Sequence, residues 1–144
     1  MKLAIDNNTL ADVFFADTRI LGIVAPVKIY SFCWLLNQAL GCDFRLNNDI
    51  EIQLSKKGRQ YFFSVYEFCE PGNSLAHYIY NNQFDGEFLL PEFRNLDFLW
   101  LLKGDDVQDG YIPFLQQSIK NIGEVQLITE LDKDKIKNRT HLIF

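Results

Sequence analysis

Two carboxylates in one short stretch are the residues of this sequence best suited to do chemistry. The stretch is 90–98, with the sequence LPEFRNLDF, and the two acids are Glu92 and Asp97. Paired carboxylates can serve as general acid and general base when their environments differ. Asp97 also stands inside an apolar run, 96–102, where a buried carboxylate must be paired or hydrogen-bonded because burying it alone is costly.

Both acids also have structural interpretations. Glu92 follows Pro91, so it would stand in the first turn of a helix, where a negative charge is stabilised by about 0.3–1 kcal/mol. This position explains Glu92 without a function. Asp97 could pair with Arg94, accept a hydrogen bond from a loop N–H, or face a pocket. We favour structural anchoring for Asp97 over ligand binding, and ligand binding over catalysis.

The same stretch resembles the signature of the IPExxxVDY family, a bacterial family with no established activity. Pro91, Glu92 and Asp97 stand where the signature has its Pro, Glu and Asp. The signature's Ile, Val and Tyr are replaced by residues that keep apolar or aromatic character: Leu90, Leu96 and Phe98. The last replacement removes a hydroxyl, so the resemblance implies no role for that phenol in this chain.

Three other stretches are similar to the family as well. They are an apolar strand at 20–23, an aromatic helix at 30–37 with a Cys-Trp pair and an Asn, and an apolar end at 142–144. The resemblance therefore spans most of the chain. Because the family has no established activity, it implies no catalytic residue.

The clearest helix pattern runs over 27–40, after Pro26 and before Gly41, which suits a left-handed C-terminal cap. Apolar residues occupy most of its circumference, so we expect the domain or a second subunit to cover more than one side. Trp34 widens this apolar surface. The polar residue Asn37 interrupts this surface. It could face solvent, anchor the helix to a neighbouring strand, or contact a ligand.

Other reactive side chains are few. His77 falls within a predicted strand, and we expect an edge or partly buried imidazole bonded to the backbone rather than a general base or metal ligand. Cys33 fits a core position. The 3 cysteines are widely spaced, without a metal-ligand pattern, which predicts reduced thiols and no metal site. No phosphate-binding or nucleophile motif occurs, and we expect no cofactor.

Composition narrows the class of protein. A chain of 144 residues with 13 Phe, 6 Tyr and 2 Trp predicts a single globular domain, 1–144. The net charge of −5 disfavours nucleic-acid binding, and the basic residues of 133–139 alternate with acids as on a solvated surface. Every apolar run is much shorter than the about 20 residues that a membrane-spanning helix needs. We identify no secretion signal at the N-terminus, so we expect a cytoplasmic protein.

Periodicity places the remaining elements. Asn7-Asn8 reads as a break after the first strand, and a hairpin joins two strands through a turn at 56–58. A helix is expected at 113–121 and a helical turn at 133–138. Strands are expected at 3–5, 18–24, 50–55, 60–68, 75–80 and 125–131.

Residues 91–103 allow two interpretations, a turn at Pro91 followed by a strand at 96–103, or one helix capped by Gly104. We favour the turn and strand, because 96–102 lacks the polar side of a surface helix. The predicted fold is α+β, with a single mostly antiparallel sheet and two main helices packed on one face. The last β-α-β unit could hold its strands parallel through a right-handed crossover.

Two functional hypotheses follow. The first is a non-catalytic cytosolic binding or adaptor module that acts through an apolar aromatic surface, forms a homodimer and has a possible protein partner. The second is a small-ligand or enzymatic pocket lined by Trp34, Trp100 and tyrosines, with Glu92 and Asp97 as its polar groups. RNA contact is disfavoured by charge. The candidate binding residues are Trp34, Asn37, Pro91, Glu92 and Asp97, and no residue is assigned to catalysis.

Overall fold

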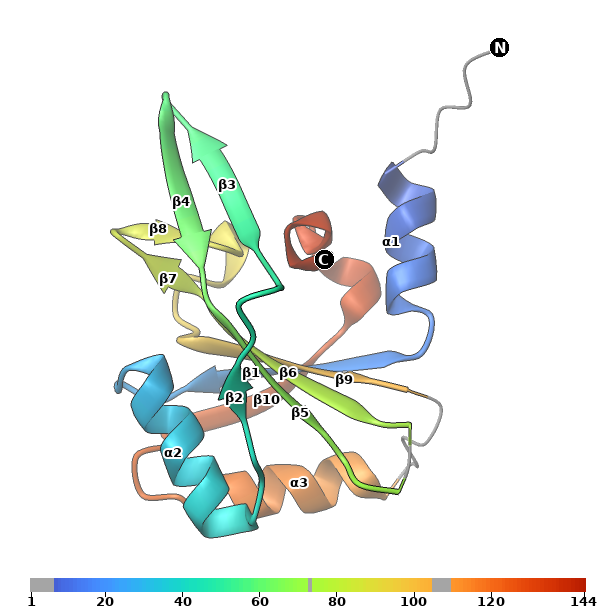
Figure 1. The fold of residues 1–144 in the computed structure, drawn as a ribbon, viewed down its shortest axis with the longest axis vertical. Helices are drawn as coiled ribbons and strands as arrows, with labels where there is room; N and C mark the ends of the chain where they lie inside the picture. Colours follow the sequence, from blue (N-terminus) through green and yellow to red (C-terminus); the bar gives the residue numbers. More distant parts are fainter. Residues whose placement is uncertain (1–6, 73, 105–109) are drawn as a thin grey trace.

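The fold, a computed structural model, is described for residues 7–72, 74–104 and 110–144 (Figure 1). Its centre is a 6-stranded sheet in the order β10-β1-β9-β6-β5-β2, and each neighbouring pair is antiparallel. The prediction of an α+β fold with a mostly antiparallel sheet is confirmed. The strands are β1 (Thr18–Val24), β2 (Arg45–Leu46), β5 (Val65–Cys69), β6 (Ala76–Asn81), β9 (Phe98–Lys103) and β10 (Leu127–Leu131).

Two helices cover one face of this sheet, as predicted. They are α2 (Ile29–Leu40) and α3 (Tyr111–Lys120), which lie together below the sheet in Figure 1. A further helix, α1 (Asn7–Phe15), lies on the other side and corrects the prediction of a break at Asn7-Asn8. Ala11 and Phe15, one helical turn apart, are both buried, so tertiary packing outweighs the local preference of asparagine for turns. The predicted strand at 3–5 lies outside the described residues.

Strand β9 separates two hydrophobic cores. Phe98, Trp100 and Leu102 belong to the core under α2 and α3, whereas Leu99 and Leu101 belong to the core on the opposite face. Side chains alternate across a strand, so a strand covered on both faces is apolar at nearly every position. This explains the unbroken apolar run. The preferred interpretation of 91–103 is confirmed, because a short 3-10 helix, η1 (Pro91–Phe93), precedes the strand.

Two hairpins extend from the central sheet. The predicted hairpin is confirmed as β3 (Ile52–Lys56) and β4 (Arg59–Phe63), joined by Lys57 and Gly58, which both have positive φ. The strand predicted at 60–68 is divided after β4, because β4 pairs within the projecting hairpin and β5 joins the central sheet (Figure 1). The second hairpin consists of β7 (Gln83–Phe84) and β8 (Glu87–Phe88).

The last β-α-β unit holds its strands parallel but not adjacent. Strands β9 and β10 each pair antiparallel with β1, which lies between them. The helical turn expected at 133–138 corresponds to η2 (Lys133–Lys135), and η3 (Arg139–Leu142) follows it. Among the described residues, no helix has the length and apolar character needed to cross a membrane.

Candidate functional site

The loop that carries the two acids is held in place by Asn82, which is completely buried after the end of β6. Its side-chain N–H groups donate to the carbonyl oxygens of Phe93 and Leu96, each at 2.9 Å. Its side-chain oxygen accepts the N–H of Leu90 at 2.9 Å. One side chain thus satisfies three backbone groups of the loop. In the sequence, Asn82 carries only the weak signal of a turn residue.

Glu92 has a structural role on the face of the sheet opposite α2 and α3. Its carboxylate accepts the backbone N–H of Asn138 at 2.8 Å and the side-chain Nδ2–H of Asn138 at 2.9 Å. Burial raises the pKa of Glu92, but hydrogen bonds from the Asn138 side chain and from backbone groups outweigh burial, and the pKa is lowered overall. Pro91 opens η1 directly before it. Glu92 therefore joins this loop to the C-terminal segment.

Asp97 holds the start of β9 against the end of β1. Its Oδ2 accepts the N–H of Ala25 at 2.8 Å, and its own N–H donates to the carbonyl of Ile23 at 2.8 Å. The alternative of a loop N–H is confirmed, whereas Arg94 lies over the ring of Phe88 at 5.9 Å. Burial raises the pKa of Asp97, and the bond from Ala25 offsets part of this rise.

The two acids do not share the cavity that Asp97 faces. This cavity has a volume of about 540 Å³ and lies beside the start of α2, and Glu92 is not among its lining residues. Each carboxylate instead accepts a backbone N–H. The geometry gives no support to an acid–base pair formed by Glu92 and Asp97.

Trp34 and Asn37 differ in their surroundings although both stand on α2. Trp34 is 60% exposed. Asn37 is half-buried and bonds both backbone groups of Phe44, accepting its N–H at 2.8 Å and donating to its carbonyl at 3.2 Å. Asn37 is therefore an anchor for the loop after α2, not a solvent-facing residue. This anchor places the Phe44 ring edge-on against Trp100, with the ring centroids 5.3 Å apart.

The cavity best equipped for recognition lies beside Trp100. It has a volume of about 460 Å³ and is enclosed by the end of α2, by α3 and by residues of β5, β6 and β9. Aromatic and aliphatic side chains form most of its walls: Leu40, Phe68, Trp100, Phe114 and Leu115. Five side chains with polar or thiol groups line it: Cys42, Glu70, His77, Tyr111 and Ser118.

A side-chain network fixes the charge state of this cavity. The Nε1–H of Trp100 donates to Nδ1 of His77 at 3.0 Å. An indole N–H can only donate, so Nδ1 carries no proton and Nε2 carries the proton of the neutral ring. Nε2 then donates to Glu70 at 2.6 Å, and the hydroxyl of Tyr111 donates to the same carboxylate oxygen at 3.1 Å.

The expectation of an edge or partly buried imidazole bonded to the backbone is wrong. His77 is 2% exposed on an inner strand, and its partners are side chains. Burial lowers the pKa of His77 and outweighs the bond and negative charge of Glu70, which raise it. The imidazole is thus neutral near pH 7, and the net charge of the network is that of Glu70.

This arrangement suits binding better than catalysis. Both nitrogens of His77 are used in hydrogen bonds, so the ring has no lone pair available for proton abstraction. Burial, together with the charge of Glu70, raises the pKa of Cys42 to about 11. A thiol with this pKa is protonated at neutral pH and is a poor nucleophile. His77 and Tyr111 instead hold the carboxylate of Glu70 in a defined position beside the aromatic walls of the cavity.

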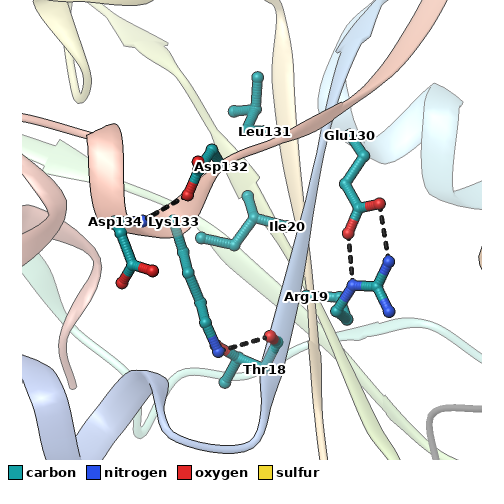
Figure 2. A pocket seen from close by; sticks show the side chains of 8 residues that line it. All are labelled: Thr18, Arg19, Ile20, Glu130, Leu131, Asp132, Lys133 and Asp134. Carbon is teal, nitrogen blue, oxygen red and sulfur yellow. Dashed lines mark hydrogen bonds and ion pairs between the residues drawn. The ribbon is translucent and has the colours of Figure 1, made fainter.

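A pocket of about 360 Å³ at the β10 edge of the sheet has a different character (Figure 2). Arg19 and Glu130 form a two-point ion pair across it. The Lys133 ammonium donates to the carbonyls of Phe15 at 2.6 Å and Thr18 at 3.0 Å, and so caps the end of α1. These charges serve the fold, because they are already matched by protein groups.

Sequence reasoning anticipated part of the cavity beside Trp100. Trp100 was expected to line a pocket and does so, whereas Trp34 is not among the lining residues. Glu70 and Tyr111 were missed, because Glu70 precedes a Pro-Gly turn and Tyr111 stands two residues before the helix predicted at 113–121. The available signal was a glutamate and a histidine on either side of the turn of one hairpin, β5–β6.

In the described ranges, no group of three His, Cys, Asp or Glu side chains is placed to hold a metal ion, and all three cysteines are free. Comparisons of the chain with protein-family models, curated proteins and solved structures found no match.

Proposed function

We propose that this chain is a non-catalytic cytosolic binding module that self-associates through the outer side of α2. The observation that carries the proposal is the composition of that helix, IYSFCWLLNQAL, which contains no charged residue. Tyr30 and Trp34, one helical turn apart, are 59% and 60% exposed. Because the solvent side of a helix normally carries charged residues, a neutral side with two large aromatic groups favours a partner surface.

A second copy of the chain is the partner that the charges favour. Each copy has a net charge of −5, so contacts through most of the surface bring like charges together. A two-fold axis across α2 places two helices without charged residues against each other, and the nearby Lys28 ammonium lies over the Tyr30 ring, 5.9 Å from its centroid. Tyr and Trp are also the side chains that most often dominate the energy of an interface.

Self-association is tested by sedimentation equilibrium at micromolar concentrations. We expect a monomer–dimer equilibrium, and Trp34→Ala should weaken it by about 30-fold or more, as for a central interface tryptophan. Phe84→Ala, at an exposed aromatic residue of β7, is the matched control and should leave the dimer intact. A wild-type monomer without concentration dependence, or equal weakening by both variants, would contradict the proposal.

Small-ligand binding is the second candidate function, and the cavity beside Trp100 supports it. A pocket of this kind needs apolar walls and a few convergent polar groups, which Glu70 and Tyr111 supply. The earlier form of this hypothesis, a pocket that uses Glu92 and Asp97, has less support, because each acid bonds the backbone of a different segment.

Membership of the IPExxxVDY family is also a proposal. It is supported by the three matching residues, Pro91, Glu92 and Asp97, which all lie in the loop that leads into β9. In this chain both acids accept backbone hydrogen bonds. The test is the structure of a family member, in which the corresponding acids should make the same two contacts. A member whose two acids converge on one cavity would contradict the proposal.

A further inference from the structure

We propose that the cavity beside Trp100 binds a small apolar amine in its cationic form. The ammonium group would lie next to Glu70, and the apolar part would contact the aromatic walls. This inference does not depend on self-association through α2, because neither Tyr30 nor Trp34 lines the cavity.

The size and walls of the cavity define the apolar part of the ligand. A volume of about 460 Å³ lies within the usual range for small-molecule sites. A neighbouring cavity of about 490 Å³ shares Ala39, Leu40 and Ser118 with it. The two cavities are thus adjacent, and the second is lined further along by Leu35 and Ile122. An aromatic or aliphatic group attached to the amine can occupy the first cavity and point toward the second.

The charge of the network defines the polar part. His77 is neutral, since its Nδ1 accepts the indole N–H of Trp100, and so the Glu70–His77–Tyr111 cluster is negative. Among the described residues that line the cavity, none is Lys or Arg. Aromatic ring faces attract cations, and the accessible aromatic rings of the walls are Phe68, Tyr111 and Phe114, since Trp100 is 1% exposed. The walls and the carboxylate therefore favour the same sign of ligand charge.

The ligand need not displace the bonds that Glu70 already makes. Attraction between an ammonium group and a carboxylate depends on their charges and on the low dielectric of the site. The bonds from Tyr111 and His77 hold the carboxylate at one position, so little order has to be created on binding. A carboxylate ligand would meet repulsion, and an uncharged ligand would gain only apolar contact.

The test compares three probes of similar shape at neutral pH: 2-phenylethylamine, 2-phenylethanol and 3-phenylpropionate. Binding is measured by calorimetry and by the NMR signal of the Trp100 indole N–H. We expect the amine to bind about tenfold more tightly than the alcohol, and the propionate to bind more weakly than both. Failure of the amine to bind, or equal affinity for amine and alcohol, would overturn the proposal.

Two substitutions locate the effect. Glu70→Gln should remove the preference for the amine, whereas Glu130→Gln, at an acid of the pocket at the β10 edge, should preserve it. Should Glu70→Gln not fold, Phe114→Ala provides the second test, because this residue lines the cavity and is 69% exposed. It should weaken amine and alcohol alike by about threefold or more. Unchanged affinities in Phe114→Ala, or a retained preference in Glu70→Gln, would overturn the proposal.

A further variant separates this inference from the proposed dimer. Trp34→Ala should bind 2-phenylethylamine as the wild type does, because Trp34 is outside the cavity. If the protein is a dimer but binds none of the three probes, only the proposed ligand site is contradicted. If the protein is a monomer but binds the amine, only the proposed self-association is contradicted.

Discussion

The loop before β9 and the cavity beside Trp100 use polar side chains in opposite ways. In the loop, Asn82, Glu92 and Asp97 each bond backbone groups of another segment. In the cavity, the polar side chains bond one another, from Trp100 to His77 and from His77 and Tyr111 to Glu70. The polar groups of both sets have hydrogen-bond partners. The partners are backbone groups in the loop and side chains in the cavity.

This difference separates what maintains the fold from what is suited to recognition. A side chain that bonds the backbone determines the path of the chain, and its loss leaves buried backbone groups without partners. A side chain that bonds another side chain at a cavity determines the position of a functional group instead. Substitutions in the loop should therefore cost more stability than substitutions in the cavity network.

The largest effect is expected for Asn82→Ala. The substitution leaves the N–H of Leu90 and the carbonyl of Leu96 without their partner, whereas the carbonyl of Phe93 still accepts the N–H of Leu96. At about 1–3 kcal/mol for each of these two unsatisfied groups, the free energy of unfolding should fall by about 2–6 kcal/mol in urea denaturation. Asn95→Ala, at an exposed asparagine of the same loop, is the control and should change it by less than about 0.5 kcal/mol.

An intermediate effect is expected at Asp97. Asp97→Ala removes the acceptor for the N–H of Ala25 and should lower the free energy of unfolding by about 1–3 kcal/mol. Asp97→Asn should cost less, because the amide oxygen can accept the same N–H. Equal losses in the two variants would show that the carboxylate charge, rather than the hydrogen bond, holds this segment.

The raised pKa of Asp97 adds a dependence on pH. The ordinary value is 3.8, and burial raises it in the folded state. Below the ordinary value both states keep the proton. As the pH rises through the raised pKa, the unfolded state releases the proton first, so folding loses stability. Relative to Asp97→Asn, the wild type should thus become less stable from about pH 3 to neutral pH, as measured by urea denaturation.

The smallest effect on stability is expected for Tyr111→Phe. Tyr111 is half-buried, and its hydroxyl bonds the Glu70 carboxylate rather than the backbone. The loss should be about 0.5–1.5 kcal/mol in the same denaturation measurement. If Tyr111→Phe is as damaging as Asn82→Ala, the distinction between the loop and the cavity network does not hold.

Local pattern was sufficient for the elements in which neighbouring residues carry the information. The strand predicted at 18–24 matches β1, and the helix predicted at 27–40 contains α2. Asp97 could be identified as an anchor because an acid in an apolar run must find a donor. Helix α1 was not predictable in this way, since its stability depends on burying Ala11 and Phe15 against distant segments.

The sequence by itself determined the fold class, the composition of α2 and the need to satisfy Asp97, because these depend on the order of residues along the chain. Only the tertiary structure decided that Glu70, His77, Trp100 and Tyr111 form one network. The pairing of β5, β6 and β9 and the placement of α3 bring these residues together. A hydrogen bond needs its atoms within about 3 Å, and no local periodicity specifies that distance between separate segments.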